Sequence, residues 1–420
     1  MSESLRIAIV GGGASGFLAA ITAKEINPSA EVYIFEKNPK MLVKVGLTGG
    51  GRCNVTNSFR HVTDLKQVYP RGHKLMKRLF NQFDYKDAIQ WFERRGVPLY
   101  VQENECVFPK SDDAQTVIDC LISHARQAGV KLVAGYNLKQ IVSCEESLQY
   151  KLLFSTKPTT GGCSEMIEKT FDRVVFTMGG MPKQEGLQMF SSLGLKVEAP
   201  VPSLFPLVVT DKAFCELSGT AIAEVSLSIP STKFRVQGSL LVTHSGMSGP
   251  AVLKLSSHAA RYLSEHQYVC AVSVNWLVQL SRQEVEDRLK QFAIINPKKQ
   301  LSTINPFILP SRLWHYLLEK SHLPLDRKWA EVGQKAFNQL IEVLTNDQYQ
   351  INGRGKHKEE FVTCGGLALS NVNLNTLESK LHPHLFFAGE LLDIDAVTGG
   401  FNLQAAWTTG YVVGKHICEP

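Results

Sequence analysis

The sequence predicts an α/β protein built on a Rossmann-like domain, into which a β-barrel and a small helical subdomain are inserted. Three observations lead to this fold class. An apolar strand at 5–10, a helix at 14–26 and a second strand at 31–35 form one βαβ unit at the start of the chain. From residue 191 the sequence becomes rich in short strands and then helical. From residue 363 it returns to a glycine-punctuated α/β pattern, so we expect both ends of the chain to form one domain.

Hydrophobic periodicity and turn residues predict the elements between these landmarks. Helical patterns occur at 71–95 and 113–128, and a buried strand at 173–177 closes the first region. The inserted part begins with short alternating segments, which are typical of an antiparallel sheet or barrel and lie at 223–229, 239–243 and 268–276.

An amphipathic helix follows in the insertion, because apolar residues recur there at i, i+3, i+4 and i+7. They are Phe337, Leu340, Ile341 and Leu344. A strand at 385–388 and a helix at 402–414 then complete the first domain. The predicted boundaries are 1–190 and 363–420 for the α/β domain, 191–278 and 347–362 for the barrel-like insert, and 279–346 for the helical subdomain.

Composition excludes several classes of protein. The 420 residues include 45 Lys and Arg against 39 Asp and Glu, a formal charge of +6 that is not segregated, so we expect no nucleic-acid partner. The nine cysteines contain no C-x-x-C pair, which indicates reduced thiols in the cytoplasm and no metal site. The N-terminus lacks the pattern of a signal peptide, and no apolar run reaches the roughly 18 residues of a membrane span.

A glycine-rich turn joins the first strand to the first helix. Gly11, Gly13 and Gly16 fit the G-x-G-x-x-G fingerprint, with Ala14 and Ser15 opening the helix. The first glycine permits a tight turn, the second admits a pyrophosphate, and the third lets helix and strand pack closely. The N–H groups of the helix N-terminus favour an anion at this point.

An acidic residue supports a nucleotide at this turn. Glu36 ends the second strand, twenty residues past Gly16, where its carboxylate can accept from an adenosine ribose hydroxyl. The alternative is a glycine turn in an α/β fold without a nucleotide. The strand, helix and acid in register favour the ADP half of a dinucleotide.

Two distant segments indicate FAD rather than NAD. The loop at 47–57 contains three consecutive glycines that permit close approach to a ring or phosphate, and its Arg52 suits a phosphate or a flavin edge. Near the C-terminus, Gly389 and Glu390 end a strand with an acid suited to a ribityl hydroxyl. The helix that opens at 398–402 can direct free N–H groups to the flavin N1 and C2 carbonyl.

Four ordered motifs make the chain resemble a known family, the BaiN/YhiN-like bacterial flavoproteins. The motifs lie at 51–57, 243–250, 362–366 and 389–404 and span nearly the whole chain. The departures are small: Thr48 stands where the family often has Ser, and Phe361 where it often has Gln. The resemblance implies a glutathione-reductase-type FAD domain interrupted by a β-barrel and a helical subdomain.

The resemblance also implies activity as an FAD- or NAD(P)/FAD-dependent oxidoreductase. Members are linked to reduction of conjugated double bonds in steroid-like acids and to aminoketone oxidation, and the relationship includes aminoacetone-oxidase-like proteins. Motifs and resemblance together predict a set of FAD-binding residues. These are Gly11, Gly13, Ala14, Ser15, Gly16, Glu36, Lys37, Lys44, Gly50, Gly51, Arg52, Cys53, Asn54, Leu138, Thr177, Gly179, Gly389, Glu390, Gly400, Phe401 and Asn402.

Candidate residues for the chemistry are fewer. His244 ends a predicted strand and is a candidate general acid or base, although a lone His is more often a residue that ties a loop. Cys53 lacks a neighbouring cysteine for a dithiol relay and is better interpreted as a packed residue. The basic loop 354–358 is a candidate for an NADPH phosphate or an acidic substrate, or is merely solvated. The serine in 246–249 does not fit a hydrolase elbow, because Pro250 replaces the required glycine.

The sequence predicts no separate NAD(P)H domain. The nearest second fingerprint, at 179–183, is interrupted by Pro182 and lacks a third glycine. We therefore expect an FAD-dependent oxidoreductase that transfers hydride through flavin N5 to or from a small to medium organic substrate. NAD(P)H is a candidate co-substrate that docks directly at the flavin. The alternatives are a tRNA-modifying flavoprotein, an amine or aminoketone oxidase, and a flavoprotein whose FAD is structural or sensory.

Overall fold

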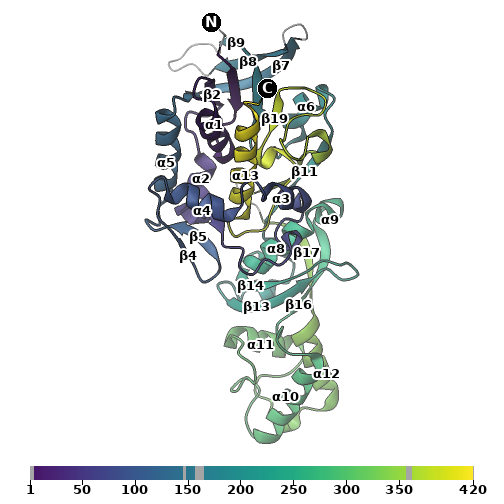
Figure 1. Cartoon of the computed structure of the whole chain (residues 1–420). Helices are drawn as coiled ribbons and strands as arrows, with labels where there is room; N and C mark the ends of the chain where they lie inside the picture. Colours follow the sequence, from purple (N-terminus) through teal and green to yellow (C-terminus); the bar gives the residue numbers. More distant parts are fainter. Residues whose placement is uncertain (1–3, 145–147, 157–164, 356–361, 420) are drawn as a thin grey trace. The chain divides into compact units, whose positions relative to one another are not determined.

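The computed structural model describes residues 4–144, 148–156, 165–355 and 362–419. The chain divides into two compact units, one formed by Met1–Val201 with Val362–Pro420 and the other by Pro202–Phe361 (Figure 1). Each unit has its own cluster of buried apolar side chains. We call them the α/β unit and the inserted unit.

A five-stranded parallel sheet forms the centre of the α/β unit. Its strand order is β19-β10-β1-β2-β6, so the chain reverses direction across the sheet beside β1. The central strands are apolar and buried, as is typical of the inner strands of a parallel sheet. The strands are β1 Arg6–Val10, β2 Glu31–Glu36, β6 Lys131–Ala134, β10 Arg173–Phe176 and β19 Leu385–Phe387.

The first and last helices pack along one another, α1 (Ala14–Ile26) against α13 (Phe401–His416). Two glycines of α13 allow the close approach, because a Cβ on Gly410 would lie 2.4 Å from the carbonyl oxygen of Ser15 and one on Gly414 would lie 2.6 Å from that of Ala19. The other helices of the unit are α2 Val43–Leu47, α3 His73–Leu79, α4 Tyr85–Glu93, α5 Ala114–Gln127 and α6 Gln188–Ser192.

Smaller sheets surround the parallel sheet. An antiparallel β7-β8-β9 sheet follows β6, a second antiparallel group has the order β3-β5-β4, and β11 pairs with β18. The bounds are β3 Thr56–Asn57, β4 Leu99–Val101, β5 Cys106–Pro109, β7 Tyr136–Cys144, β8 Gln149–Thr156, β9 Met166–Phe171, β11 Val197–Ser203 and β18 Val362–Leu367.

The inserted unit contains a closed barrel with the strand order β12-β15-β14-β13-β16-β17. Closure leaves the barrel without the unpaired edges that would otherwise invite aggregation. Its strands are β12 Leu207–Val209, β13 Ala221–Ser228, β14 Arg235–Thr243, β15 Gly246–Ser248, β16 Val269–Asn275 and β17 Asp347–Arg354. Its short helices are α7 Lys212–Cys215, α8 Pro250–His258 and α9 Ala260–Glu265.

Three longer helices lie between β16 and β17 and form the helical part of the inserted unit. They are α10 Arg282–Ile295, α11 Ser311–Lys320 and α12 Gln334–Asn346. A buried polar network joins α11 to the barrel. Asp347 accepts hydrogen bonds from Trp276 Nε1 at 3.1 Å and from the Tyr349 hydroxyl at 2.5 Å, and it pairs with Lys320 Nζ at 2.6 Å.

The predicted fold class is confirmed: a Rossmann-type α/β unit carries an insertion with a barrel and helices. The β7-β8-β9 sheet was not predicted as a separate element. Among the described residues, no helix is long and apolar enough to cross a membrane. The same residues contain no group of three or more metal-binding side chains.

Candidate functional site

The glycine turn lies at the carboxyl ends of β1 and β10. Between these two strands the strand order reverses, because β2 and β6 lie on one side of β1, and β10 and β19 lie on the other. Such a switch point is where open α/β sheets form a ligand crevice. Gly11 has φ +118°, and a Cβ there would lie 2.4 Å from the carbonyl oxygen of Thr177. A Cβ on Gly16 would lie 2.2 Å from the carbonyl oxygen of Gly11. Both positions therefore require glycine for the close packing of α1 on the sheet.

Gly13 differs from its neighbours, because a Cβ at this residue would meet no atom within 4 Å. It is the N-cap of α1, and the N-terminus of that helix has neither a side-chain cap nor an acidic residue in its first turn. Ala14 and Ser15 begin the helix directly behind it. The space in front of Gly13 and the N–H groups facing it suit a pyrophosphate.

Glu36 lies beside this turn at the end of β2. Its Oε2 accepts from the backbone N–H of Gly12 at 2.9 Å, and its Oε1 accepts from the backbone and side-chain nitrogens of Asn38 at 2.9 and 2.8 Å. Asn38 was not singled out in the sequence, although it follows the predicted acid by two residues. These bonds fix the orientation of the carboxylate. Lys37 beside it is exposed.

The second glycine-rich loop has an unusual backbone. Gly49, Gly50 and Gly51 have φ values of +59°, +70° and +88°, and Cβ atoms on the last two would meet nothing within 4 Å. Arg52 follows them with its guanidinium 4.2 Å from the centre of the Phe108 ring. The loop therefore presents open backbone on one side and a stacked cation on the other.

Cys53 is buried behind the loop with φ +61°. Burial raises the pKa of its thiol to about 12, opposed by a hydrogen bond with Thr48. The side chain is therefore a neutral thiol at physiological pH and not a nucleophile. This agrees with its interpretation as a packed residue.

Asn54 connects the second loop to the last helix. With its amide oriented to match its neighbours, the side chain donates to the carbonyl of Thr56 at 2.9 Å and accepts from the N–H of Gly400 at 3.0 Å. Gly400 is the N-cap of α13 and has φ +89°. The start of α13 is thereby positioned against a loop that lies 346 residues earlier in the chain.

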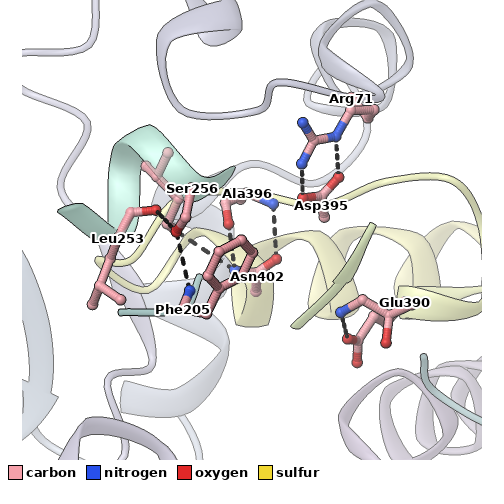
Figure 2. A network of polar contacts seen from close by, with 10 residues as sticks. Arg71, Phe205, Leu253, Ser256, Glu390, Asp395, Ala396 and Asn402 are labelled. Carbon is pink, nitrogen blue, oxygen red and sulfur yellow. Dashed lines mark hydrogen bonds and ion pairs between the residues drawn. The ribbon is translucent and has the colours of Figure 1, made fainter. Parts of the chain in front are cut away.

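The N-terminus of α13 has no side-chain cap and no acidic residue in its first turn. The side chain of Asn402 turns back to the preceding loop, accepting from Ala396 N at 2.9 Å and donating to Ala396 O at 2.9 Å (Figure 2). The carbonyl of Phe401 accepts from the Tyr69 hydroxyl at 2.9 Å. The side chain of Asn402 is thus occupied in holding the loop. Only its backbone N–H group is available to bind a ligand.

Glu390 follows β19 in a short 3₁₀ turn. Its carboxylate accepts from Lys44 Nζ at 2.9 Å and from the backbone N–H of Thr363 at 3.0 Å. A Cβ on Gly180 would lie 2.6 Å from its Oε1, and one on Gly389 would lie 2.5 Å from Ser15 Oγ. The predicted residues Lys44, Ser15 and Glu390 therefore lie close together. Gly180 and Thr363 also contact Glu390, although neither was among the predicted FAD-binding residues.

The remaining predicted residues differ in their roles. Thr177 donates to the carbonyl of Gly11 at 2.8 Å, so its hydroxyl stabilises the glycine turn. Gly179 has φ +77°, and a Cβ there would lie 3.9 Å from both Lys44 Nζ and Glu390 Oε2. Leu138 is buried in β7 opposite Phe154, where its side chain belongs to the core.

A buried ion pair in the α/β unit was missed by sequence reasoning. Arg71 and Asp395 form a bidentate pair in which their side chains are 12% and 1% exposed (Figure 2). Val397 N also donates to the carbonyl of Val68 at 2.9 Å. The segment around Arg71 therefore holds the loop that leads into α13. No local pattern signals a pair that is 324 residues apart.

His244 belongs to the inserted unit. It lies in the two-residue turn between β14 and β15, where Thr243 pairs with Gly246, and it is exposed. This placement neither assigns nor removes a catalytic role. Of the basic loop 354–358, residues 356–358 lie outside the described part of the chain.

The α/β unit offers what FAD requires. Open space lies in front of Gly13, two uncapped helix N-termini provide N–H donors, and oriented carboxylates of Glu36 and Glu390 suit ribose and ribityl hydroxyls. These groups come from segments that are far apart in the sequence and belong to one unit. Their number and chemistry fit a long dinucleotide better than a single phosphate.

The family model described as the HI0933-like protein Rossmann domain matches residues 5–416. The match covers nearly the whole chain, so the chain belongs to this family. Its predicted assignment to the FAD-dependent oxidoreductases is confirmed at the level of the family.

Curated relatives align over their full length. A 3-dehydro-bile acid delta(4,6)-reductase of Clostridium scindens is 27% identical over 425 residues, covering 99% of both chains. A ribosomal RNA dihydrouridine synthase of Haemophilus influenzae is 26% identical over 419 residues, again covering 99% of both. A protein of the same name from Escherichia coli is 26% identical and covers 97% of both.

Solved structures with a similar fold include a 3-ketosteroid-delta4-(5alpha)-dehydrogenase from Rhodococcus jostii RHA1. It has a TM-score of 0.52 at 12% identity, covering 100% of this chain and 98% of the other. A 3-ketosteroid delta1-dehydrogenase from Sterolibacterium denitrificans has a TM-score of 0.51 at 11% identity, covering 98% of both. At these identities the likeness concerns the fold alone.

Proposed function

We propose, from its membership of the HI0933-like family and from the polar groups and glycine turns of the α/β unit, that this protein binds FAD and reduces a carbon–carbon double bond conjugated to a carbonyl group. These groups of the α/β unit carry the cofactor part of the proposal. They combine the uncapped N-termini of α1 and α13 with the oriented carboxylates of Glu36 and Glu390. The names of the relatives support the substrate class.

Those names describe two substrates with one chemical feature in common. Reduction of a 3-dehydro-bile acid at delta(4,6) concerns double bonds conjugated to a ketone. Formation of dihydrouridine saturates the C5–C6 double bond of uracil, which is conjugated to the C4 carbonyl. In both cases a hydride adds to an electron-poor carbon that is conjugated to the carbonyl, the β-carbon or, in a dienone, also the δ-carbon, and a proton is added to the neighbouring carbon of that double bond.

The residues of this chain have defined tasks in such a reaction. Bound FAD, once reduced, would supply the hydride. The N–H groups of Ala14 and Ser15 would hold the pyrophosphate, and Glu36 and Glu390 would orient the sugar hydroxyls. The backbone N–H groups at the start of α13 would stabilise negative charge on the ring system. His244 remains a candidate proton donor for the α-carbon.

NAD(P)H is proposed as the reductant that restores the reduced cofactor. The described residues contain one parallel sheet with one glycine fingerprint, so we propose that the nicotinamide docks directly against the flavin. We therefore expect weak nucleotide binding that depends on the presence of FAD. The buried thiol of Cys53 takes no part in this transfer.

An anaerobic experiment tests the reaction class. The purified yellow protein is mixed with NADH or NADPH while the flavin band near ~450 nm is followed. An α,β-unsaturated ketone, such as a 3-oxo-delta4 steroid, is then added. We expect bleaching by one of the nucleotides, reoxidation by the enone and a saturated product. Bleaching by aminoacetone but by neither nucleotide would instead identify an aminoketone oxidase.

A second candidate substrate is a uracil base in RNA, in contrast to the expectation from composition that no nucleic acid binds. It is favoured by two full-length relatives that are named for dihydrouridine formation in ribosomal RNA. The test uses deproteinised ribosomal RNA in place of the enone. Reoxidation of the reduced protein together with dihydrouridine in the digested RNA would identify this substrate. Reoxidation by the steroid alone would exclude it.

A further inference from the structure

Two basic dipeptides meet in the helical part of the inserted unit. Lys298-Lys299 follows α10, and Arg327-Lys328 follows α11. Backbone hydrogen bonds pair the two segments, from Leu301 N to Arg327 O at 2.8 Å and from Trp329 N to Lys299 O at 3.0 Å. An antiparallel bridge between Gln300 and Lys328 lies between these bonds. We call this pair of segments, 298–301 and 327–329, the basic clip.

The cations of the clip are available to a partner. Lys298, Lys299 and Lys328 are exposed and Arg327 is half-buried. Within the part of the chain that the structure describes, none of the four forms an ion pair.

Three other cations of the helical part have acidic partners. They are Lys290 with Glu286, Arg282 with Glu342 and Lys320 with Asp347, each at 2.6 Å. What distinguishes the clip is that its four cations, none of them in an ion pair with a described residue, lie on two segments that are hydrogen-bonded to each other.

The clip stands on a rigid base. Leu301 and Trp329 are 0% and 1% exposed. Trp314 donates from Nε1 to the carbonyl of Leu301 at 2.8 Å and stacks on Trp329 at 6.4 Å. Cations held on fixed backbone lose less conformational freedom on binding than cations on a loose loop.

Nearby acids leave an excess of positive charge. Asp326 and Glu331 are the exposed carboxylates within the flanking sequence, against four cations. Glu331 directs its Oε2 to the backbone N–H of Lys328 at 3.3 Å. A partner with closely spaced phosphates complements this arrangement, because each neutralised phosphate releases counterions.

We propose that the basic clip is a docking surface for the phosphate backbone of RNA. The proposal rests on the second candidate function above, for which it names the surface that holds the polynucleotide. The exposed aromatic side chains that read single-stranded bases are not part of the clip. The contact is therefore independent of base sequence and dependent on salt, and recognition of the base occurs elsewhere.

The test measures RNA binding by the full-length, FAD-loaded protein. The probe is a fluorescein-labelled single-stranded RNA of about 20 nucleotides, followed by fluorescence anisotropy over a range of salt concentrations. The variant K298Q/K299Q/R327Q/K328Q is expected to bind at least about tenfold more weakly near 100 mM salt. The slope of log K against log salt is expected to fall by about 2 to 3, at roughly 0.7 per cation removed.

A matched comparison uses two double variants. K298Q/K328Q removes two exposed cations from the clip, and K212Q/K233Q removes two exposed cations from the barrel side of the same unit. We expect only the first to weaken RNA binding. Equal effects of the two pairs, or RNA binding that the quadruple variant leaves unchanged, would overturn the proposal.

Two further outcomes distinguish this proposal from membrane binding and from the second candidate function. Ile294 and Ile295, which are 78% and 75% exposed at the end of α10, make an anionic membrane surface the competing partner. Clip-dependent binding to phosphatidylglycerol vesicles without RNA binding would overturn the proposal. Clip-dependent RNA binding by a protein that forms no dihydrouridine would uphold the docking surface and contradict the second candidate function.

Discussion

At the scale of single residues, the glycines of the turn serve two purposes. The fold requires glycine at two of the positions, whereas at the third position we expect a ligand to require it. Gly11 and Gly16 are fixed by contacts within the protein, since a Cβ at either would lie less than 3 Å from backbone atoms. Gly13 meets nothing. The open space beside Gly13 is therefore available to a ligand, for which we propose the pyrophosphate of FAD.

Substitution of Gly13 and Gly16 is expected to have opposite consequences. Gly13→Ala fits the protein, because φ is −98° and no atom lies near the new Cβ, so the apoprotein keeps its thermal stability. Its FAD affinity falls at least about tenfold, because the methyl group occupies the pyrophosphate position. Gly16→Ala costs about 1–3 kcal/mol of folding free energy through its clash with Gly11.

Calorimetry of the apoproteins and FAD titration followed by fluorescence measure the two effects. A Gly13→Ala protein that binds FAD as tightly as the parent would contradict the proposed position of the pyrophosphate. A Gly16→Ala protein as stable as Gly13→Ala would contradict the steric explanation.

Cys53 is expected to resist alkylation in the native protein. Its thiol is fully buried, and burial raises its pKa to about 12. The Cys53 thiol is protonated below that pH, so raising the pH from 7 to 9 leaves it unreactive. Exposed thiols, in contrast, are alkylated faster at pH 9, because more of each is present as the thiolate. Iodoacetamide labelling with peptide mass spectrometry checks this. Labelling of Cys53 at the rate seen in denaturant would show that the loop opens.

At the scale of elements, ion pairs and hydrogen bonds join segments that are distant in sequence. Asn54 and Gly400 link the second glycine loop to α13, and Arg71 and Asp395 link the segment before α3 to the loop before α13. In the inserted unit, Lys320 on α11 and Asp347 at the start of β17 connect helices to barrel. Each link sets the position of one element against another.

The link in the inserted unit predicts a pH-dependent variant. Lys320→Met leaves the Asp347 carboxylate buried without its cation, which costs about 3–5 kcal/mol near neutral pH. Burial already raises the pKa of Asp347 in the parent protein, despite the opposing effect of Lys320. Loss of Lys320 raises that pKa further, so a decrease in pH protonates the carboxyl and reduces the cost.

Denaturant unfolding of both proteins at pH 5 and pH 8, with Lys320→Arg as the charge-preserving control, measures this difference. The expected result is a larger destabilisation of Lys320→Met at pH 8 than at pH 5. A destabilisation that is independent of pH would assign the effect to lost packing.

At the scale of the whole molecule, the chain contains two units with separate cores. The inserted unit is continuous from Pro202 to Phe361, whereas the α/β unit requires both ends of the chain. The strands of the closed barrel are all contained in the inserted unit. The barrel is therefore complete without strands from the α/β unit.

We expect a fragment of residues 202–361 to fold alone. It should unfold in one cooperative transition, because its apolar core and the Asp347 network are complete within it. Circular dichroism with thermal unfolding tests this, and an α/β unit made by joining 201 to 362 through a short linker should retain FAD. A fragment that shows no cooperative transition would mean that its core depends on the α/β unit.

Local sequence determined much of this molecule. The βαβ unit, the positions of Gly11, Gly13, Gly16 and Glu36, and the return to α/β sequence at the C-terminus follow from spacing and periodicity over short distances. These features depend on residues that are close together along the chain, so they can be predicted from the sequence alone. The predicted Glu390 and Asn54 were also found within the same unit as the turn.

Only the tertiary structure decided which distant groups meet. The pairing of Arg71 with Asp395 and the convergence of Lys298-Lys299 with Arg327-Lys328 have no local signal. Such contacts depend on the packing of whole elements, and the free energy that selects them is distributed over many side chains. The substrate depends on the same long-range packing, because a cavity is shaped by all the elements that line it.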